Sequence, residues 1–274
     1  MFEEYLPLKL MEEVETRIPR GFQMMKDIHC ANGEEDVGSW PEWCYAPLDA
    51  AACVALFAGD VECEDIEKML DLASPLAEKL FAVAPWVEQK KVYVLDPALE
   101  EYVLKNRVIL ARIPSMDLVH MPYASFYIQV NSLGTDGYPL HGAFVTLNYD
   151  QETAAQECRI LFLYSNYTWE SCAVTMGERS VFGAIQDVLD TIGAEDDCRR
   201  EGSESLEFEE AYRRWKKQME GTLQLVFFLC LMEYYKEDGA LTAVTRFSPV
   251  GEMDISYVSK PKDPTLRCME AFAC

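Results

Sequence analysis

"ASFYIQV" at residues 124–130, "GAFVTLNY" at 142–149, "CRILFLYS" at 158–165 and "WESCAVTM" at 169–176 decide the fold. These segments are rich in β-branched and aromatic residues, and clusters of Gly, Pro, Asn and Asp separate them, as is typical of strands joined by turns. "RVILARI" at 107–113 adds another segment of the same kind. Strands that follow one another directly favour an antiparallel meander. We therefore predict an antiparallel sheet of about five strands.

The residues before this sheet have the pattern of helices. Apolar residues recur at every fourth position from residue 6 to residue 18, and Pro19 ends that helix. Residues 22–30 and 49–58 predict two more helices, and residues 64–86 predict a helix that is broken at Ser74-Pro75. Short apolar runs that favour single strands stand at three further places, "KVYVL" at 91–95, "LTAVTRF" at 241–247 and "DISYVSK" at 254–260.

Two helices are expected after the meander. The first places Val181, Ile185 and Val188 on one face, and Thr175 with Glu178 fits a capping box before it. The second has a continuous apolar stripe that we expect to be core. The stripe consists of Phe208, Tyr212, Trp215, Met219, Leu223, Val226 and Cys230.

Together these patterns predict an α+β fold with helices packed on one face of the sheet. The expected division is a helical N-terminal region at residues 1–106 and an antiparallel sheet with C-terminal helices at residues 107–274. The alternative is that the two regions form one compact domain.

The composition is strongly acidic, with 24 Lys and Arg against 47 Asp and Glu and a formal net charge of −23. Such a surface repels nucleic acid phosphates and anionic membranes and attracts basic partners. Direct DNA binding and membrane binding are therefore not expected. The alternative interpretation is that the excess of acids only keeps an aromatic-rich protein soluble.

The ten cysteines contain no Cys-x-x-Cys pair, and several stand inside apolar runs, where a free thiol behaves as a small hydrophobic group. The N-terminus has no basic start of a signal peptide. The longest apolar stretch, Leu223 to Met232, is shorter than the roughly 20 residues that span a bilayer. We expect ten free thiols and a cytoplasmic protein.

No group of residues predicts catalysis, a metal or a cofactor. The histidines are His29, His120 and His141, and Asp117 could pair with His120, but no segment has the pattern of a nucleophile elbow. The acids at 62, 64, 65 and 67 surround the start of a helix, where the helix dipole favours negative charge. They are the candidates for a metal site if the protein cleaves phosphodiesters.

Two groups of side chains are candidates for binding. Aromatic residues in loops beside acids can hold a peptide with basic and apolar side chains, although aromatic residues that close a core are the ordinary interpretation. The candidate peptide-binding residues are Trp43, Tyr45, Trp86, Tyr123 and Trp169. The densest basic cluster could contact RNA or the ribosome, or it could be a solvated helix face. Its members are Arg213, Arg214, Lys216 and Lys217.

The order of segments resembles the second type V-A anti-CRISPR family, from about Met24 to Lys262. The segments that match are "WPEWCYAPLDAAACVALF" (40–57), "VYVLDPALEEYVLKN" (92–106), "IPSMDLVHMPYASFYIQV" (113–130), "HGAFVTLNYD" (141–150), "TMGERSVFGAIQDVLD" (175–190), "LQLVFFLCLMEYY" (223–235) and "VSKPK" (258–262). The resemblance contains no motif by which binding residues can be transferred position by position. Family members continue into a basic, aromatic tail, whereas this chain ends at "DPTLRCMEAFAC" (263–274).

The resemblance implies a non-enzymatic inhibitor encoded on a phage or mobile element, or a relative of such an inhibitor on a plasmid or bacterial chromosome. It would bind the N-terminal peptide of the type V-A CRISPR effector nuclease as that peptide leaves the ribosome, and the message would then be degraded by a host nuclease. Two other functions stay open. One is an acidic decoy that mimics nucleic acid, and the other is a metal-dependent ribonuclease.

Overall fold

The computed structural model describes residues 5–59, 66–105, 121, 123–130, 139–177, 179–199, 206–234, 243–247 and 254–258. Its sheet has the strand order β5-β4-β3-β2-β1-β7-β6. The strands are β1 (Lys91–Leu95), β2 (Ser125–Gln129), β3 (Leu140–Asp150), β4 (Ala155–Tyr164), β5 (Trp169–Met176), β6 (Ala243–Phe247) and β7 (Asp254–Val258). The strands expected at 91–95, 241–247 and 254–260 are confirmed, and the one expected at 107–113 lies outside the described residues.

The predicted α+β class is confirmed, but the sheet is mixed rather than wholly antiparallel. Strands β2 to β5 form the expected antiparallel meander. Strand β1 instead pairs in parallel with β2 on one side and with β7 on the other. Parallel neighbours need a crossover connection, and between β1 and β2 the chain forms helix α5 (Pro97–Lys105). Sequence periodicity shows a strand but not its direction.

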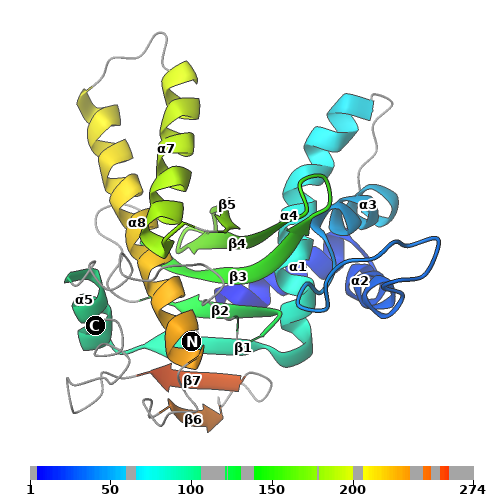
Figure 1. Cartoon of the computed structure of the whole chain (residues 1–274), viewed down its shortest axis with the longest axis horizontal. Coiled ribbons are helices and arrows are strands. Elements are labelled where there is room, and N and C mark those ends of the chain that lie inside the picture. The colour runs from blue at the N-terminus through cyan, green and yellow to red at the C-terminus, as the bar shows by residue number, and fades with distance from the viewer. Residues whose placement is uncertain are drawn as a thin grey trace.

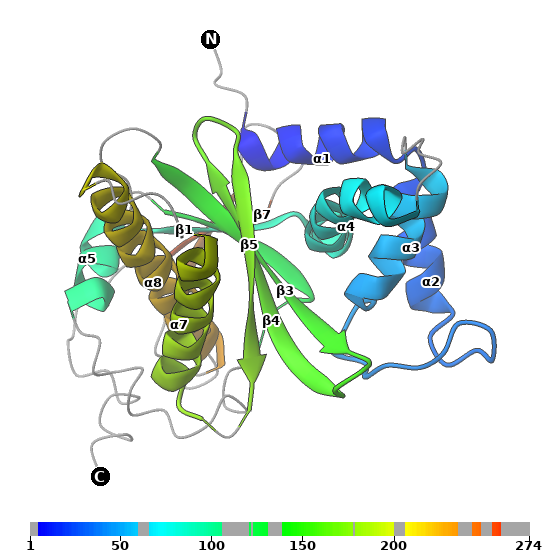
Figure 2. The same ribbon diagram turned by 90° about the horizontal axis from the view of Figure 1, so that it is seen from above.

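Helices cover both faces of the sheet, whereas one covered face was expected (Figure 1, Figure 2). The first layer contains α1 (Leu6–Arg17), α2 (Gly21–Cys30), α3 (Leu48–Ala58) and α4 (Ile66–Gln89). The second contains α5, α7 (Val181–Arg199) and α8 (Leu206–Tyr234). The reason lies in β2, where Phe126 and Ile128 enter one apolar cluster and Tyr127 enters another. A strand that is apolar on both faces needs cover on both.

Helix α4 is continuous through Pro75 and Pro85, so the break expected at Ser74-Pro75 is absent. Leu76 and Leu80 of α4 are almost fully buried against the other helices of its layer. Burial of a long apolar face outweighs the local preference against proline, because tertiary packing routinely overrides helix propensity.

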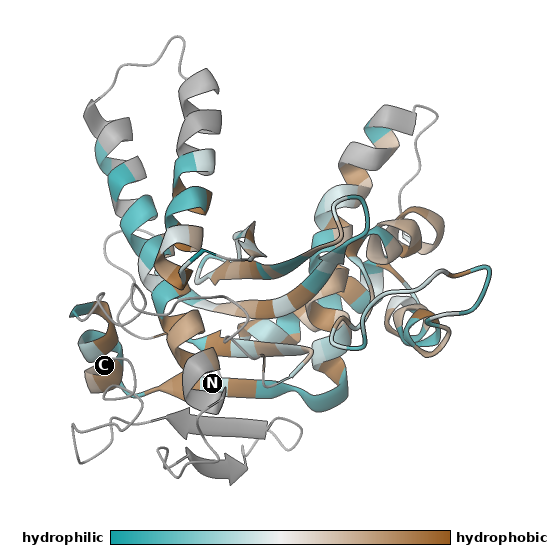
Figure 3. Ribbon diagram, viewed as in Figure 1, coloured by the Kyte–Doolittle hydropathy of each residue, from teal (hydrophilic) through white to brown (hydrophobic). Residues whose placement is uncertain are grey.

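The C-terminal helices largely follow the expected pattern. Helix α7 begins at Val181, and Ser180 caps it because its Oγ accepts the Gly183 N–H at 3.1 Å. The expected capping box is wrong at Thr175, which belongs to β5. In α8 the stripe is buried from Met219 to Cys230, and Trp215 is only partly buried. Figure 3 shows hydrophobic colour on α8 where it crosses the sheet and hydrophilic colour further up.

The division at residue 106 remains a prediction. Strand β1, from the first region, lies between β2 and β7, which both come from the second region. We propose that the two regions form one compact domain, as the alternative interpretation expected.

Candidate functional site

A groove of about 340 Å³ lies between strand β5 and helix α7. We call it the β5–α7 groove. Its lining residues are small, apart from Val188 and the carboxylate of Asp187. They are Ser171, Cys172, Ala173, Thr175, Ala184, Asp187, Val188 and Thr191. Because β5 is the terminal strand in the order of the described strands, the groove follows an edge of the sheet.

The turn between β4 and β5 determines which backbone groups of β5 point outward. The Tyr164 N–H donates to the Thr168 carbonyl at 2.9 Å, so these two residues form a hydrogen-bonded pair. The register then runs without a shift from Leu163 opposite Trp169 to Gln156 opposite Met176. In an antiparallel ladder, hydrogen-bonded pairs alternate with pairs that are not bonded to each other. The residues of β5 that direct N–H and C=O away from β4 are therefore Trp169, Ser171, Ala173 and Thr175.

One carboxylate, Asp187, lines the groove, and Asp190 lies about one turn further along α7. Asp187 forms an ion pair with Arg179, and both side chains are more than half exposed. Asp190 lies 3.6 Å from Lys216, and its side chain is 74% exposed. Exposed pairs of this kind contribute little to stability, about 0–1 kcal/mol. A basic ligand could therefore compete for these carboxylates at small cost.

The cysteine in the groove, Cys172, is buried. Burial raises the pKa of the Cys172 thiol to about 12, so the thiol stays protonated. Burial also raises the pKa of Cys44 to about 12. The six cysteines that the structure describes are free thiols, as expected for them.

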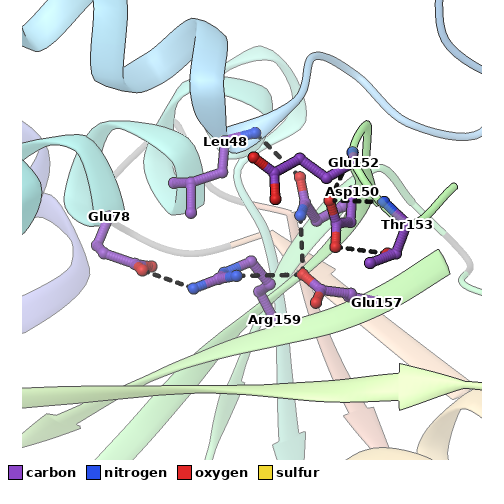
Figure 4. Close-up of polar contacts among 8 residues, drawn as sticks. Leu48, Glu78, Asp150, Glu152, Thr153, Glu157 and Arg159 are labelled. Atoms are coloured by element: carbon purple, nitrogen blue, oxygen red, sulfur yellow. Dashed lines mark hydrogen bonds and ion pairs between the residues drawn. The ribbon is translucent and has the colours of Figure 1, made fainter. Parts of the chain in front are cut away.

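A polar network fastens the first helical layer to β3 and β4 (Figure 4). Arg159 donates to Glu78 at 2.7 Å and to Glu157 at 3.1 Å. The Asn148 side chain donates to Glu157 at 2.8 Å and accepts the Leu48 N–H at 2.9 Å. These side chains pair with one another between the helices and the strands, so the network is structural.

Two of the predicted aromatic residues lie in the connection between α2 and α3 of the first helical layer. Tyr45 stacks on His29 with ring centroids 4.3 Å apart, and its hydroxyl donates to Glu88 at 3.2 Å. Trp43 is partly buried and makes an edge contact with Tyr149 at 6.1 Å.

The other three predicted aromatic residues are dispersed. Trp86 is fully buried, and its indole N–H donates to the Lys91 carbonyl at 2.8 Å. Tyr123 is half-buried beside the Lys91 amine, which lies 5.4 Å from the ring centroid. Trp169 begins β5, with the Lys79 amine 5.3 Å from its ring centroid. The structure therefore does not bring the five aromatic residues together, and Trp169 alone among them belongs to the strand that lines the groove.

The basic cluster lies on α8. Arg213 and Lys217 are exposed, and Lys216 is half-buried beside Asp190. The side chain of Arg214 lies outside the described residues. The groove residues could not be predicted from the sequence, because small Ser, Ala and Thr side chains have no distinctive pattern. The only signal was the strand itself, since a terminal strand always exposes alternate backbone groups.

Two histidines make ordinary structural contacts. His29 Nδ1 lies 2.7 Å from the Tyr45 carbonyl oxygen, and His141 Nδ1 lies 2.6 Å from the Tyr127 hydroxyl. His120, Asp117 and the carboxylates at 62, 64, 65 and 67 lie outside the described residues. Among the side chains that are described, no three His, Cys, Asp or Glu residues converge as metal ligands. No helix in the described part of the chain is long and apolar enough to cross a membrane.

Comparisons with known proteins place the chain in a family. A crystal structure of AcrVA2 matches with a TM-score of 0.56, at 11% identity, over 93% of this chain and 85% of that one, which shows a shared fold. No curated protein matches the chain in sequence. The profile of the AcrVA2-like family, described as the anti-CRISPR type V subtype A2 family, matches residues 93–242, more than half of the chain. The chain therefore belongs to the AcrVA2-like family of type V-A anti-CRISPR proteins.

Proposed function

We propose that this protein inhibits production of the type V-A CRISPR effector nuclease. It binds the N-terminal peptide of the effector as that peptide leaves the ribosome, and the encoding message is then lost. The protein acts in the cytoplasm without catalysis of its own, and a host nuclease cuts the message. The observation that carries the proposal is the family match over residues 93–242.

The charge of the chain supports a basic peptide as the partner. A net charge of −23 attracts a segment rich in Lys and Arg and repels RNA and DNA. Partly exposed aromatic side chains supply apolar contacts that salt does not weaken. Trp43, Tyr123 and Trp169 have such exposure, whereas Tyr45 is nearly buried and Trp86 has none, so we leave Trp86 out of the proposed contacts.

Contact with RNA or the ribosome is assigned to the basic cluster on α8. Arg213 and Lys217 are exposed there and are free to meet phosphate. Exchange of both for Glu should not weaken peptide binding and should reduce co-sedimentation with ribosomes that translate the effector.

A titration tests the proposal. Purified protein is titrated with a synthetic peptide of the effector's N-terminal segment, with and without competitor RNA. We expect saturable binding that weakens with added salt, since screening acts beyond a Debye length of about 8 Å at physiological ionic strength, but that does not vanish. A scrambled peptide of the same composition is the control, and RNA should not compete.

Other outcomes would point to other functions. Failure to bind the peptide, together with RNA-competed binding to the intact effector, would overturn the proposal in favour of an acidic decoy. Cleavage of the message by the purified protein, abolished by a chelator, would overturn it in favour of a metal-dependent ribonuclease.

A further inference from the structure

We infer that the β5–α7 groove takes an extended basic peptide, which adds to the sheet as a strand beside β5. The inference rests on the proposed function, since the peptide is the N-terminal segment of the effector. It assigns the binding site and the mode of binding.

The backbone of β5 supplies the first part of the argument. Trp169, Ser171, Ala173 and Thr175 direct their N–H and C=O groups away from β4. Three of them, Ser171, Ala173 and Thr175, also line the groove. A chain that lies in the groove therefore meets a row of backbone donors and acceptors at the spacing of a strand. Such an edge is the template for pairing with an added strand.

The side chains of the groove supply the second part. Its volume of about 340 Å³ is at the lower end of the range for ligand sites, which suits one or two large side chains rather than a folded domain. Ala173 and Ala184 leave this space open because they have no side chain beyond Cβ. A strand placed beside β5 would direct alternate side chains to the same face. We assign the space to a large apolar side chain of the peptide.

Charge selects the peptide over a second copy of this chain. Glu170 lies on β5, and Asp187 and Asp190 lie on the facing helix, each with a large exposed surface. Two copies that paired through β5 would bring these carboxylates together at the same edge, and like charges across an interface are unfavourable. Lys or Arg side chains of a peptide would instead replace Arg179 as the partner of Asp187.

Backbone methylation of the peptide is the direct test. The effector peptide is synthesised as a series in which each member has one N-methylated amide, which removes one donor and leaves the side chains in place. Pairing with β5 predicts a period of two along the series. Alternate positions should lose affinity by about tenfold or more, as expected for one interfacial hydrogen bond, and the positions between them should keep it.

Variants of the protein test the same site from the other side. Ala173→Pro removes an outward N–H and no bond of the β4–β5 ladder, so the fold should persist while peptide affinity drops about tenfold or more. Asp187→Lys should weaken binding severalfold at low salt and less at high salt. Glu15→Lys, on exposed α1 in the other helical layer, makes the same change in net charge and should have a much smaller effect.

The outcomes separate this inference from the proposed function. Binding that is equally sensitive to methylation at all positions, or insensitive at all of them, would overturn the inference and leave the proposed function standing. Equal losses in Asp187→Lys and Glu15→Lys would also overturn it. Failure of the unmodified peptide to bind would overturn the proposed function, and the inference with it. If Ala173→Pro does not fold, the methylation series decides alone, because it uses the unaltered protein.

Discussion

The two helical layers are attached to the sheet by different kinds of contact. In the first layer, charged and polar side chains connect the helices to each other and to the strands, as Lys79 connects to Glu13 at 2.6 Å and Arg159 to Glu78 at 2.7 Å. Ser125 of β2 likewise donates to the Ala82 carbonyl of α4 at 2.9 Å. In the second layer, α5, α7 and α8 bury one large apolar cluster against the opposite face.

The difference separates a layer that is held by directional polar contacts from one that is held mainly by apolar burial. Directional contacts fix the position of the first layer, because a shifted helix would break hydrogen bonds and ion pairs between partly buried groups. Apolar burial is not directional, so the second layer can accommodate small residues and a terminal strand beside α7. The proposed binding surface lies on the side of the sheet whose helices pack on it mainly through apolar contacts.

The largest loss of stability should come from a substitution in the second helical layer, which packs through apolar side chains. Phe227 of α8 is fully buried in its cluster, so Phe227→Ala should lower the free energy of unfolding by about 3–5 kcal/mol through lost burial and a cavity. Denaturant unfolding measures this change in free energy. Phe57→Ala is the matched control, since Phe57 at the end of α3 is 85% exposed and should change stability by less than about 0.5 kcal/mol. Equal losses in the two variants would contradict the assignment of the core.

The first helical layer should lose stability when one side chain of its polar network is removed. Arg159→Ala leaves Glu78 and Glu157 without their cation, so we expect a loss of about 2–3 kcal/mol, as for hydrogen bonds to charged groups. A double-mutant cycle with Glu78→Gln measures the coupling. Additive effects of the two changes would show that the network in Figure 4 does not act as a unit.

The pH dependence of stability tests the same layer at Glu13. Burial alone would raise the pKa of Glu13, but hydrogen bonds from Lys79 and Tyr167 hold it below its ordinary value of 4.5. A lowered folded-state pKa stabilises the protein fully above the unfolded pKa, and this is lost as pH falls through the folded pKa. Glu13→Gln should therefore cost about 1 kcal/mol at neutral pH. The difference in stability between the wild-type protein and Glu13→Gln should disappear at acid pH. A difference that stayed constant down to acid pH would contradict the assignment.

The smallest effect is expected at the surface of α8. Lys216 pairs with an exposed carboxylate of Asp190 at 3.6 Å, so Lys216→Ala should cost less than about 0.5 kcal/mol. The apparent melting temperature in low and high salt measures it. Trp215→Ala in the preceding position should cost more, because Trp215 packs partly against the apolar cluster and its indole N–H donates to Glu170. A larger loss for Lys216 than for Trp215 would reverse our orientation of this helix.

The sequence by itself determined which segments are helices and which are strands, because periodicity and turn residues act over a few neighbours. It also determined the free thiols that are described, the acidic surface and, through the order of its segments, the family. It could not show that β1 is parallel to both its neighbours, that both faces of the sheet are covered, or that α4 continues through Pro75. Those features depend on which helices and strands pack against one another in the folded protein.

The candidate site divides in the same way. The aromatic residues conspicuous in the sequence are dispersed by the fold, and Trp86 is buried inside it. The groove is made of Ser, Ala and Thr, whose only distinction is their position on the terminal strand and beneath α7. Which strand is terminal depends on how all the strands pair, so tertiary structure alone decided that β5 ends the described sheet, where we propose that the partner binds.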